Sequence, residues 1–174
     1  MLISLMIVNR QSKVRIDMHA TREFVKKLRK CLRLGRREFN ICFVGDREMS
    51  RLNATYRGKV KSTDVLSFPW GPARGGSFKS SVDEPRSHIM AARRANPETF
   101  EPGRNFPEIF NFLGDIVIST EMARRNASEE GHSTLNEIRW LILHGVLHLL
   151  GFDHASDRGE MATLELALRA RLGI

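Results

Sequence analysis

The 174-residue chain lacks most features of secreted and membrane proteins. Its two cysteines, Cys31 and Cys42, are too few for a disulfide framework and lack C-x-x-C spacing. No apolar run approaches the roughly 18 residues of a membrane span. The apolar start, Met1 to Val8, has no basic residue before it and no small-residue cleavage site after it, so it is interpreted as a buried strand. These absences predict a cytoplasmic protein with reduced thiols and no membrane contact.

Acidic residues are fewer than basic residues. The chain has 28 Lys and Arg against 20 Asp and Glu, a net charge of +8, which favours a polyanionic partner such as a nucleic acid. Many of the basic residues surround the apolar stripe of a helix predicted from Thr21 to Leu34, and Arg36 and Arg37 extend the charge. A solvated helix face is the alternative interpretation, but this density of one sign makes the patch a candidate steering surface for RNA.

Hydrophobic periodicity predicts an α+β fold, with about four strands in one sheet and helices around it. The predicted strands after the first are Glu38 to Val44, Val65 to Phe68 (stopped by Pro69) and Leu113 to Ser119. Four later helices are predicted. The first is capped by Asp46 and ends near Arg57, and the second runs from Thr120 to Glu130. The third starts at a capping box of Thr134 and Glu137, and a closing helix runs from Arg158 to Leu172. The first two strands, joined by a helix, should be parallel with a right-handed crossover.

The length suits a single domain, 1–174, with a long loop insertion at about 71–112. This insertion is basic, rich in glycine and proline, and without clear periodicity, although Ser87 to Ala95 is predicted as a short helix. Loops of this length are uncommon inside compact domains unless they are mobile or functional. One hypothesis is that the insertion folds over RNA in a cleft.

Three histidines near the C-terminus have the spacing of a metal site. His144 and His148 lie one helical turn apart on the same face, and Gly151 can turn the chain so that His154 supplies a third nitrogen. Three protein ligands with an open fourth position are typical of a catalytic zinc. The spacing equals that of the metzincin motif H-E-x-x-H-x-x-G-x-x-H. We therefore predict one zinc ion on a central, zincin-like helix.

One residue of that motif is absent. Gly145 stands where a metalloprotease has the glutamate that deprotonates the metal-bound water, which disfavours peptide hydrolysis. A protease whose base comes from Glu137 or Asp153 remains an alternative. Glu137 lies two turns before His144 on the same face, and capping is its expected role, with support of the metal site only if the geometry closes.

The run HGVLHLLGFDH, together with N-x-x-Y-R, TDVLSFP and LGDIVIS, resembles the YbeY family of endoribonucleases over most of the chain except the insertion. The family's usual proline before Thr-Asp is Ser62 here. The resemblance implies a metal-dependent, single-strand-specific endoribonuclease that acts in maturation of the small-subunit ribosomal RNA 3′ end and in ribosome quality control. It also implies zinc as the metal, single-stranded RNA and the small ribosomal subunit as partners, and a cytoplasmic location.

Arg57, His144 and Asp153 are the predicted catalytic residues. The resemblance places Arg57 in the active-site cleft, where a guanidinium can hold a phosphodiester and balance its developing charge. Asp153, beside the third ligand, has three open roles: orienting an imidazole, acting as a base, or stabilising the turn. The nucleophile, either metal-bound water or the RNA 2′-hydroxyl, is also open. A different class of function is a metal-stabilised ribosome assembly or RNA-binding factor without hydrolytic activity. The oligomeric state does not follow from the sequence.

Overall fold

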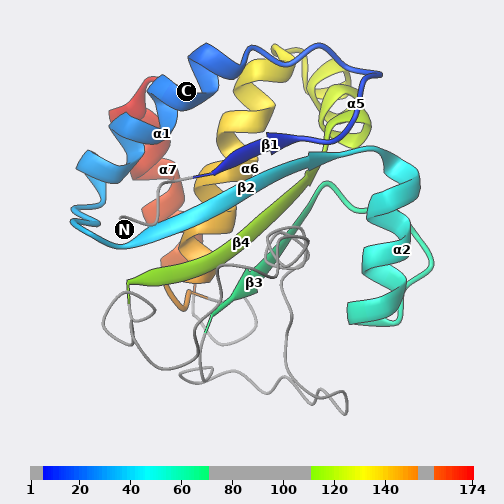
Figure 1. The fold of residues 1–174 in the computed structure, drawn as a ribbon. Coiled ribbons are helices and arrows are strands. Elements are labelled where there is room, and N and C mark those ends of the chain that lie inside the picture. The colour runs from blue at the N-terminus through cyan, green and yellow to red at the C-terminus, as the bar shows by residue number, and fades with distance from the viewer. Residues whose placement is uncertain (1–5, 71–110, 153–158) are drawn as a thin grey trace.

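The computed structural model describes residues 6–70, 111–152 and 159–174, and within them the strands form a four-stranded sheet in the order β1-β2-β4-β3 (Figure 1). Strand β2 pairs in parallel with β1 and β4, and β3 pairs antiparallel with β4. The strands are β1 (Ile7–Asn9), β2 (Glu38–Val44), β3 (Val65–Pro69) and β4 (Phe112–Ser119). The predicted α+β class and the parallel pairing of the first two strands are confirmed.

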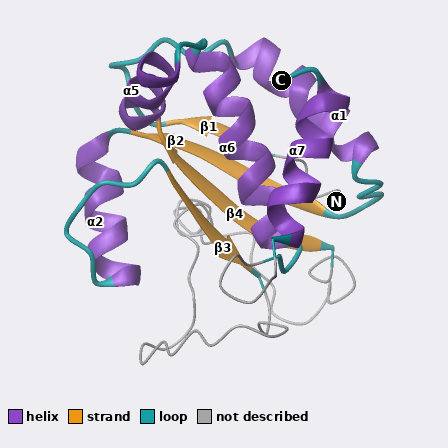
Figure 2. Ribbon diagram, turned by 180° about the vertical axis from the view of Figure 1, so that it is seen from behind, coloured by secondary structure: helices purple, strands orange, loops and turns teal. Residues whose placement is uncertain are grey.

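Helices pack on both faces of the sheet. Helices α1 (Met18–Cys31), α5 (Thr120–Glu130), α6 (Thr134–Leu149) and α7 (Glu160–Leu172) cover one face, whereas α2 (Asp46–Arg57) packs on the other (Figure 2). Alternate residues of β2 separate the two cores: Phe39, Ile41 and Phe43 join the larger cluster beneath α6, and Cys42 and Val44 join the smaller one beneath α2. The sheet is therefore buried on both sides.

Several predicted boundaries are confirmed at positions where the hydrophobic period and the cap residues indicate the same end. Strand β2 and helix α5 have their predicted bounds, and α5 ends at Gly131, whose φ of +74° suits a left-handed cap. Helix α1 begins three residues before the predicted Thr21, because the side chain of Asp17 accepts a hydrogen bond from the Ala20 amide.

The predicted roles of Asp46 and Pro69 are wrong. Asp46 is the first residue of α2 rather than its cap, and its carboxylate instead accepts hydrogen bonds from Ser119 and Arg125. Pro69 does not stop β3 but is its last residue, opposite Gly114 of β4. The edge position of β3 explains this, since a proline there leaves no ladder bond unmade.

Some predictions lie outside the described residues. They are most of the insertion at 71–112, including the helix from Ser87 to Ala95, the first five residues of the predicted opening strand, and the start of the closing helix at Arg158. Within the described ranges, no helix is long and apolar enough to cross a membrane.

Candidate metal centre

Helix α6 carries the histidines and runs against the sheet beneath β3 and β4. Its cap is Ser133, whose hydroxyl accepts a hydrogen bond from the Asn136 amide at 3.2 Å, so the predicted capping box of Thr134 and Glu137 is wrong by one residue. At the other end Gly151 has the predicted positive φ, +94°, just after the helix. The helix is buried on most sides, so its polar side chains need partners from the fold.

The structure brings His144 and His148 together at the C-terminal end of α6. Their Nε2 atoms lie 3.0 Å apart, and each Nδ1 faces an oxygen acceptor: Glu165 Oε2 at 3.2 Å for His144 and the Phe152 carbonyl at 2.9 Å for His148. An Nδ1 that donates to an acceptor leaves the Nε2 lone pair of a neutral ring exposed. Two lone pairs at 3.0 Å repel unless a proton or a metal ion lies between them. His154 and Asp153, the other predicted site residues of this turn, lie outside the described residues.

Glu165 is a member of this site that the sequence prediction missed. It comes from α7, is buried, and contacts His144 through Oε2 and Arg169 through Oε1, the latter at 2.6 Å. Burial opposes its charge, but the hydrogen bonds from His144 and Arg169 outweigh burial and lower the pKa of Glu165. A signal was present in the sequence: Glu165 interrupts the apolar stripe formed by Met161 and Leu168.

Gly145 explains the missing protease glutamate. A Cβ built on this residue would lie 2.8 Å from Cγ2 and 3.0 Å from Cδ1 of Ile116, a fully buried residue of β4. The position after the first histidine therefore points into the sheet, where no side chain fits. The Gly145 carbonyl also lies 3.4 Å from the Ser67 hydroxyl of β3, so the helix approaches the sheet closely at this point.

Arg57 lies near the edge of the sheet, on the side of α2. It is exposed at the end of α2, and the neighbouring Tyr56 ring packs against Phe68 of β3 with ring centroids 5.0 Å apart. Phe68 packs against the core beneath α2, whereas the adjacent Ser67 contacts α6, so neighbouring residues of β3 face the α2 side and the histidine helix. Among the described residues Arg57 forms no ion pair or hydrogen bond with His144 or His148, and its role in the cleft stays a prediction.

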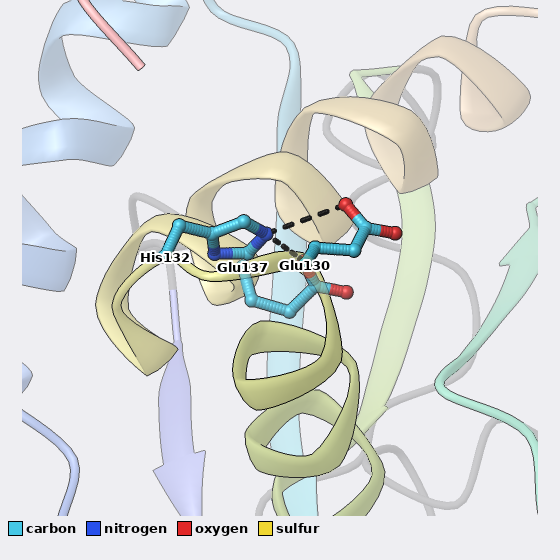
Figure 3. A group of neighbouring side chains, drawn as sticks. All are labelled: Glu130, His132 and Glu137. Atoms are coloured by element: carbon cyan, nitrogen blue, oxygen red, sulfur yellow. Dashed lines mark ion pairs between the residues drawn. The ribbon is translucent and has the colours of Figure 1, made fainter.

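A cluster of one histidine and two glutamates lies at the opposite end of α6 and was not predicted from the sequence. Among the residues that the structure describes, Glu130, His132 and Glu137 have ligand atoms within 4.8 Å of one another and could hold a metal ion (Figure 3). His132 Nε2 lies 3.5 Å from Glu130 Oε2 and 3.3 Å from Glu137 Oε2. Glu137 precedes His144 by two turns, about 10 Å along the axis, so this cluster is separate from the histidine pair.

Glu137 therefore has a different partner from those expected. Its carboxylate accepts a hydrogen bond from Asn126 at 3.2 Å and pairs with His132, and it does not cap α6, whose cap is Ser133. Burial raises the pKa of Glu137, opposed by the hydrogen bond from Asn126 and by the charge of His132. The spacing E-x-H-x4-E around the start of the helix was the available signal.

Comparison with known proteins identifies the family. A family model described as endoribonuclease YbeY matches residues 6–173. An endoribonuclease YbeY of Solibacter usitatus is 39% identical over 155 residues, which cover 89% of this chain and 79% of that protein. One of Caldicellulosiruptor bescii is 33% identical over 178 residues and covers 99% of both chains.

The fold also has a solved counterpart. The solution structure of a protein from Thermotoga maritima matches with a TM-score of 0.57 and 20% identity, and covers 97% of this chain and 89% of that one. At that identity the likeness concerns the fold alone, whereas the sequence relatives carry the family assignment. The chain belongs to the YbeY family of endoribonucleases, enzymes that cut RNA at internal phosphodiester bonds.

Proposed function

We propose that this protein is a metal-dependent, single-strand-specific endoribonuclease of the cytoplasm that acts in maturation of the small-subunit ribosomal RNA 3′ end and in ribosome quality control. The observation that carries metal dependence is the histidine pair: two Nε2 atoms at 3.0 Å, with both Nδ1 atoms facing oxygen acceptors. In this proposal residues 1–174 act as one domain, in line with the family match over residues 6–173.

The metal in this proposal is one zinc ion, held by His144, His148 and His154. Imidazole nitrogens suit zinc, and the Nε2 separation of His144 and His148 fits two ligands of one tetrahedral ion, whose nitrogen ligands lie about 3.3 Å apart at metal–nitrogen distances of about 2.0–2.1 Å. When bound, zinc lowers the pKa of a coordinated water toward roughly 7 and polarises a phosphoryl oxygen. The Nδ1 contacts keep both described rings turned toward one point.

The remaining chemistry falls to the protein side chains. Arg57 would hold the phosphodiester through two hydrogen bonds and balance the charge that develops on it. Its exposed position near the edge strand β3 is open to a long polyanion from solvent. Asp153 would orient an imidazole, act as a base, or stabilise the turn after the helix. Gly145 offers no base and points at Ile116, which supports RNA over peptide as the substrate.

The proposed partners are single-stranded RNA and the small ribosomal subunit, and the positive charge of the surface fits a polyanion. Helix α1 and the turn after it expose seven cations on the surface away from the sheet: Arg22, Lys26, Lys27, Lys30, Arg33, Arg36 and Arg37. Phosphate neutralisation by such residues releases counterions, so RNA affinity should fall with salt by about 0.7 log units per log unit of salt for each contact on single strands.

The test combines metal analysis of the purified protein with RNA cleavage by wild type, His148→Ala and Arg57→Ala. We expect about one zinc per chain, loss of metal and cleavage in His148→Ala, and loss of cleavage with metal retained in Arg57→Ala. Arg51→Ala, which removes another exposed arginine of α2, is the matched control and should cleave normally. Identification of the product ends distinguishes water from the 2′-hydroxyl as nucleophile.

Two outcomes would replace the proposal. A metal-free His148→Ala that unfolds, together with a wild type that binds ribosomes but cleaves no RNA, indicates an assembly factor whose metal is structural. Chelator-sensitive cleavage of casein without RNA cleavage indicates a protease.

A further inference from the structure

The carboxylate of Glu165 joins helix α7 to the histidine pair. It lies 3.2 Å from His144 Nδ1, which can only act as a donor toward a carboxylate. We propose that Glu165 is a positioning residue: by accepting the Nδ1–H of His144, it fixes the tautomer in which the Nε2 lone pair faces His148. This inference rests on the proposed metal site and assigns a residue outside the histidine motif to it.

The setting of Glu165 argues against an ordinary surface ion pair. The residue is only 7% exposed and occupies the face of α7 that packs toward α6, beside Met161 and Leu168. A carboxylate at an apolar position costs free energy unless its oxygens are paired. Here each oxygen has a separate partner, Oε2 with His144 and Oε1 with Arg169.

The contacts close into a ring between two helices. Trp140 and His144 are four residues apart on α6, and Glu165 and Arg169 are four apart on α7, so each pair lies on one helix face. The Arg169 guanidinium lies 4.2 Å from the centre of the Trp140 ring and 2.6 Å from Glu165. Arg169 therefore restricts the rotation of the Glu165 carboxylate before any metal binds.

The two histidines are held by different means. The acceptor for His148 is a backbone carbonyl, that of Phe152, which no substitution removes. The acceptor for His144 is a charged side chain, which also raises the basicity of the ring as a ligand. Loss of such a partner typically weakens metal affinity by about 10- to 100-fold.

The experiment compares wild type, Glu165→Ala and Glu165→Gln by zinc affinity, measured in competition with a chromophoric chelator, and by ¹⁵N NMR of the His144 ring in the metal-free protein. Glu165→Ala should bind zinc about 10- to 100-fold more weakly, and its His144 ring should carry a proton on Nδ1 less often than in wild type. Glu165→Gln keeps an acceptor oxygen without the charge, so it should recover part of both. Glu160→Gln removes an exposed carboxylate from the start of the same helix and should behave as wild type.

The results separate failure of this inference from failure of the proposed function. If wild type binds zinc and a folded Glu165→Ala binds it equally well with an unchanged tautomer, the positioning role is wrong. If wild type binds no zinc, the proposed function fails, and the tautomer in the metal-free protein still decides the role of Glu165. Should Glu165→Ala not fold, Glu165→Gln decides: unchanged zinc affinity and an unchanged tautomer overturn the assignment.

Discussion

Gly145→Ala tests whether α6 approaches the sheet as closely as its contacts indicate. An alanine inside a helix gains about 1 kcal/mol over glycine. Here the new methyl group would lie 2.8 and 3.0 Å from two carbons of Ile116, which is fully buried and cannot turn away. Overpacking of this kind costs about 1–3 kcal/mol. We therefore expect a net loss of up to about 2 kcal/mol, or several degrees in Tm at roughly 2–4 °C per kcal/mol for a domain of this size.

Urea denaturation followed by circular dichroism gives the free energy of unfolding. Ala167→Gly, at an exposed position inside α7, measures the backbone contribution alone and should lose about 1 kcal/mol. In an Ile116→Ala background, which removes the contacted carbons, Gly145→Ala should cost less than in wild type. A gain of about 1 kcal/mol in Gly145→Ala would refute the close approach, and with it our explanation of why the protease glutamate is absent.

Three further predictions concern the sheet, pH dependence and thiol chemistry. Gly114→Ala should lower the free energy of unfolding by about 3 kcal/mol or more in urea denaturation, or abolish folding, because φ is +139° and the new Cβ would clash with the Phe68 carbonyl oxygen. For Asp46 burial opposes the charge, but hydrogen bonds, including that from Arg125, lower its pKa. Asp46→Asn should therefore lower the free energy of unfolding by about 2 kcal/mol at pH 7, measured by urea denaturation. The difference between the variant and wild type should become smaller in the same measurement at acidic pH, because wild type loses the charge of Asp46 as pH falls through its lowered pKa. Burial raises the pKa of Cys42 to about 11, so at pH 8 only about one thiol in a thousand is ionised and a thiol reagent should label it only on unfolding.

The sequence predicted features that depend on local patterns. Strand β2 and helix α5 have their predicted bounds, because alternation in one and cap residues in the other act over a few positions. The start of α6 was one residue off, since Ser133 and Thr134 are both good caps and only the folded chain selects between them. That single residue decided the role of Glu137, which is then a partner of His132 rather than part of a capping box.

In the site, too, contacts within one helix could be predicted and contacts between helices could not. The spacing of His144 and His148 predicted their convergence, because the period of one helix determines it. Glu165 could not be predicted as their neighbour, since its contact with His144, twenty-one positions earlier in the chain, depends on how α7 packs against α6. The placement of Arg57 in a cleft came from family resemblance, and among the described residues Arg57 is exposed at the end of α2, which leaves that placement a prediction.

Helix α6 shows why residue spacing can locate ligands without specifying their protonation. Three described histidine rings, His132 just before α6 and the two on the helix, place Nδ1 near an oxygen acceptor. The acceptors differ: the Ser133 carbonyl, Glu165 of α7, and the Phe152 carbonyl after the turn. In each case Nε2 lies near either carboxylates or another imidazole nitrogen. Packing of α7 and of the C-terminal turn thus sets the tautomers, and through them the affinity of the histidine pair for a cation.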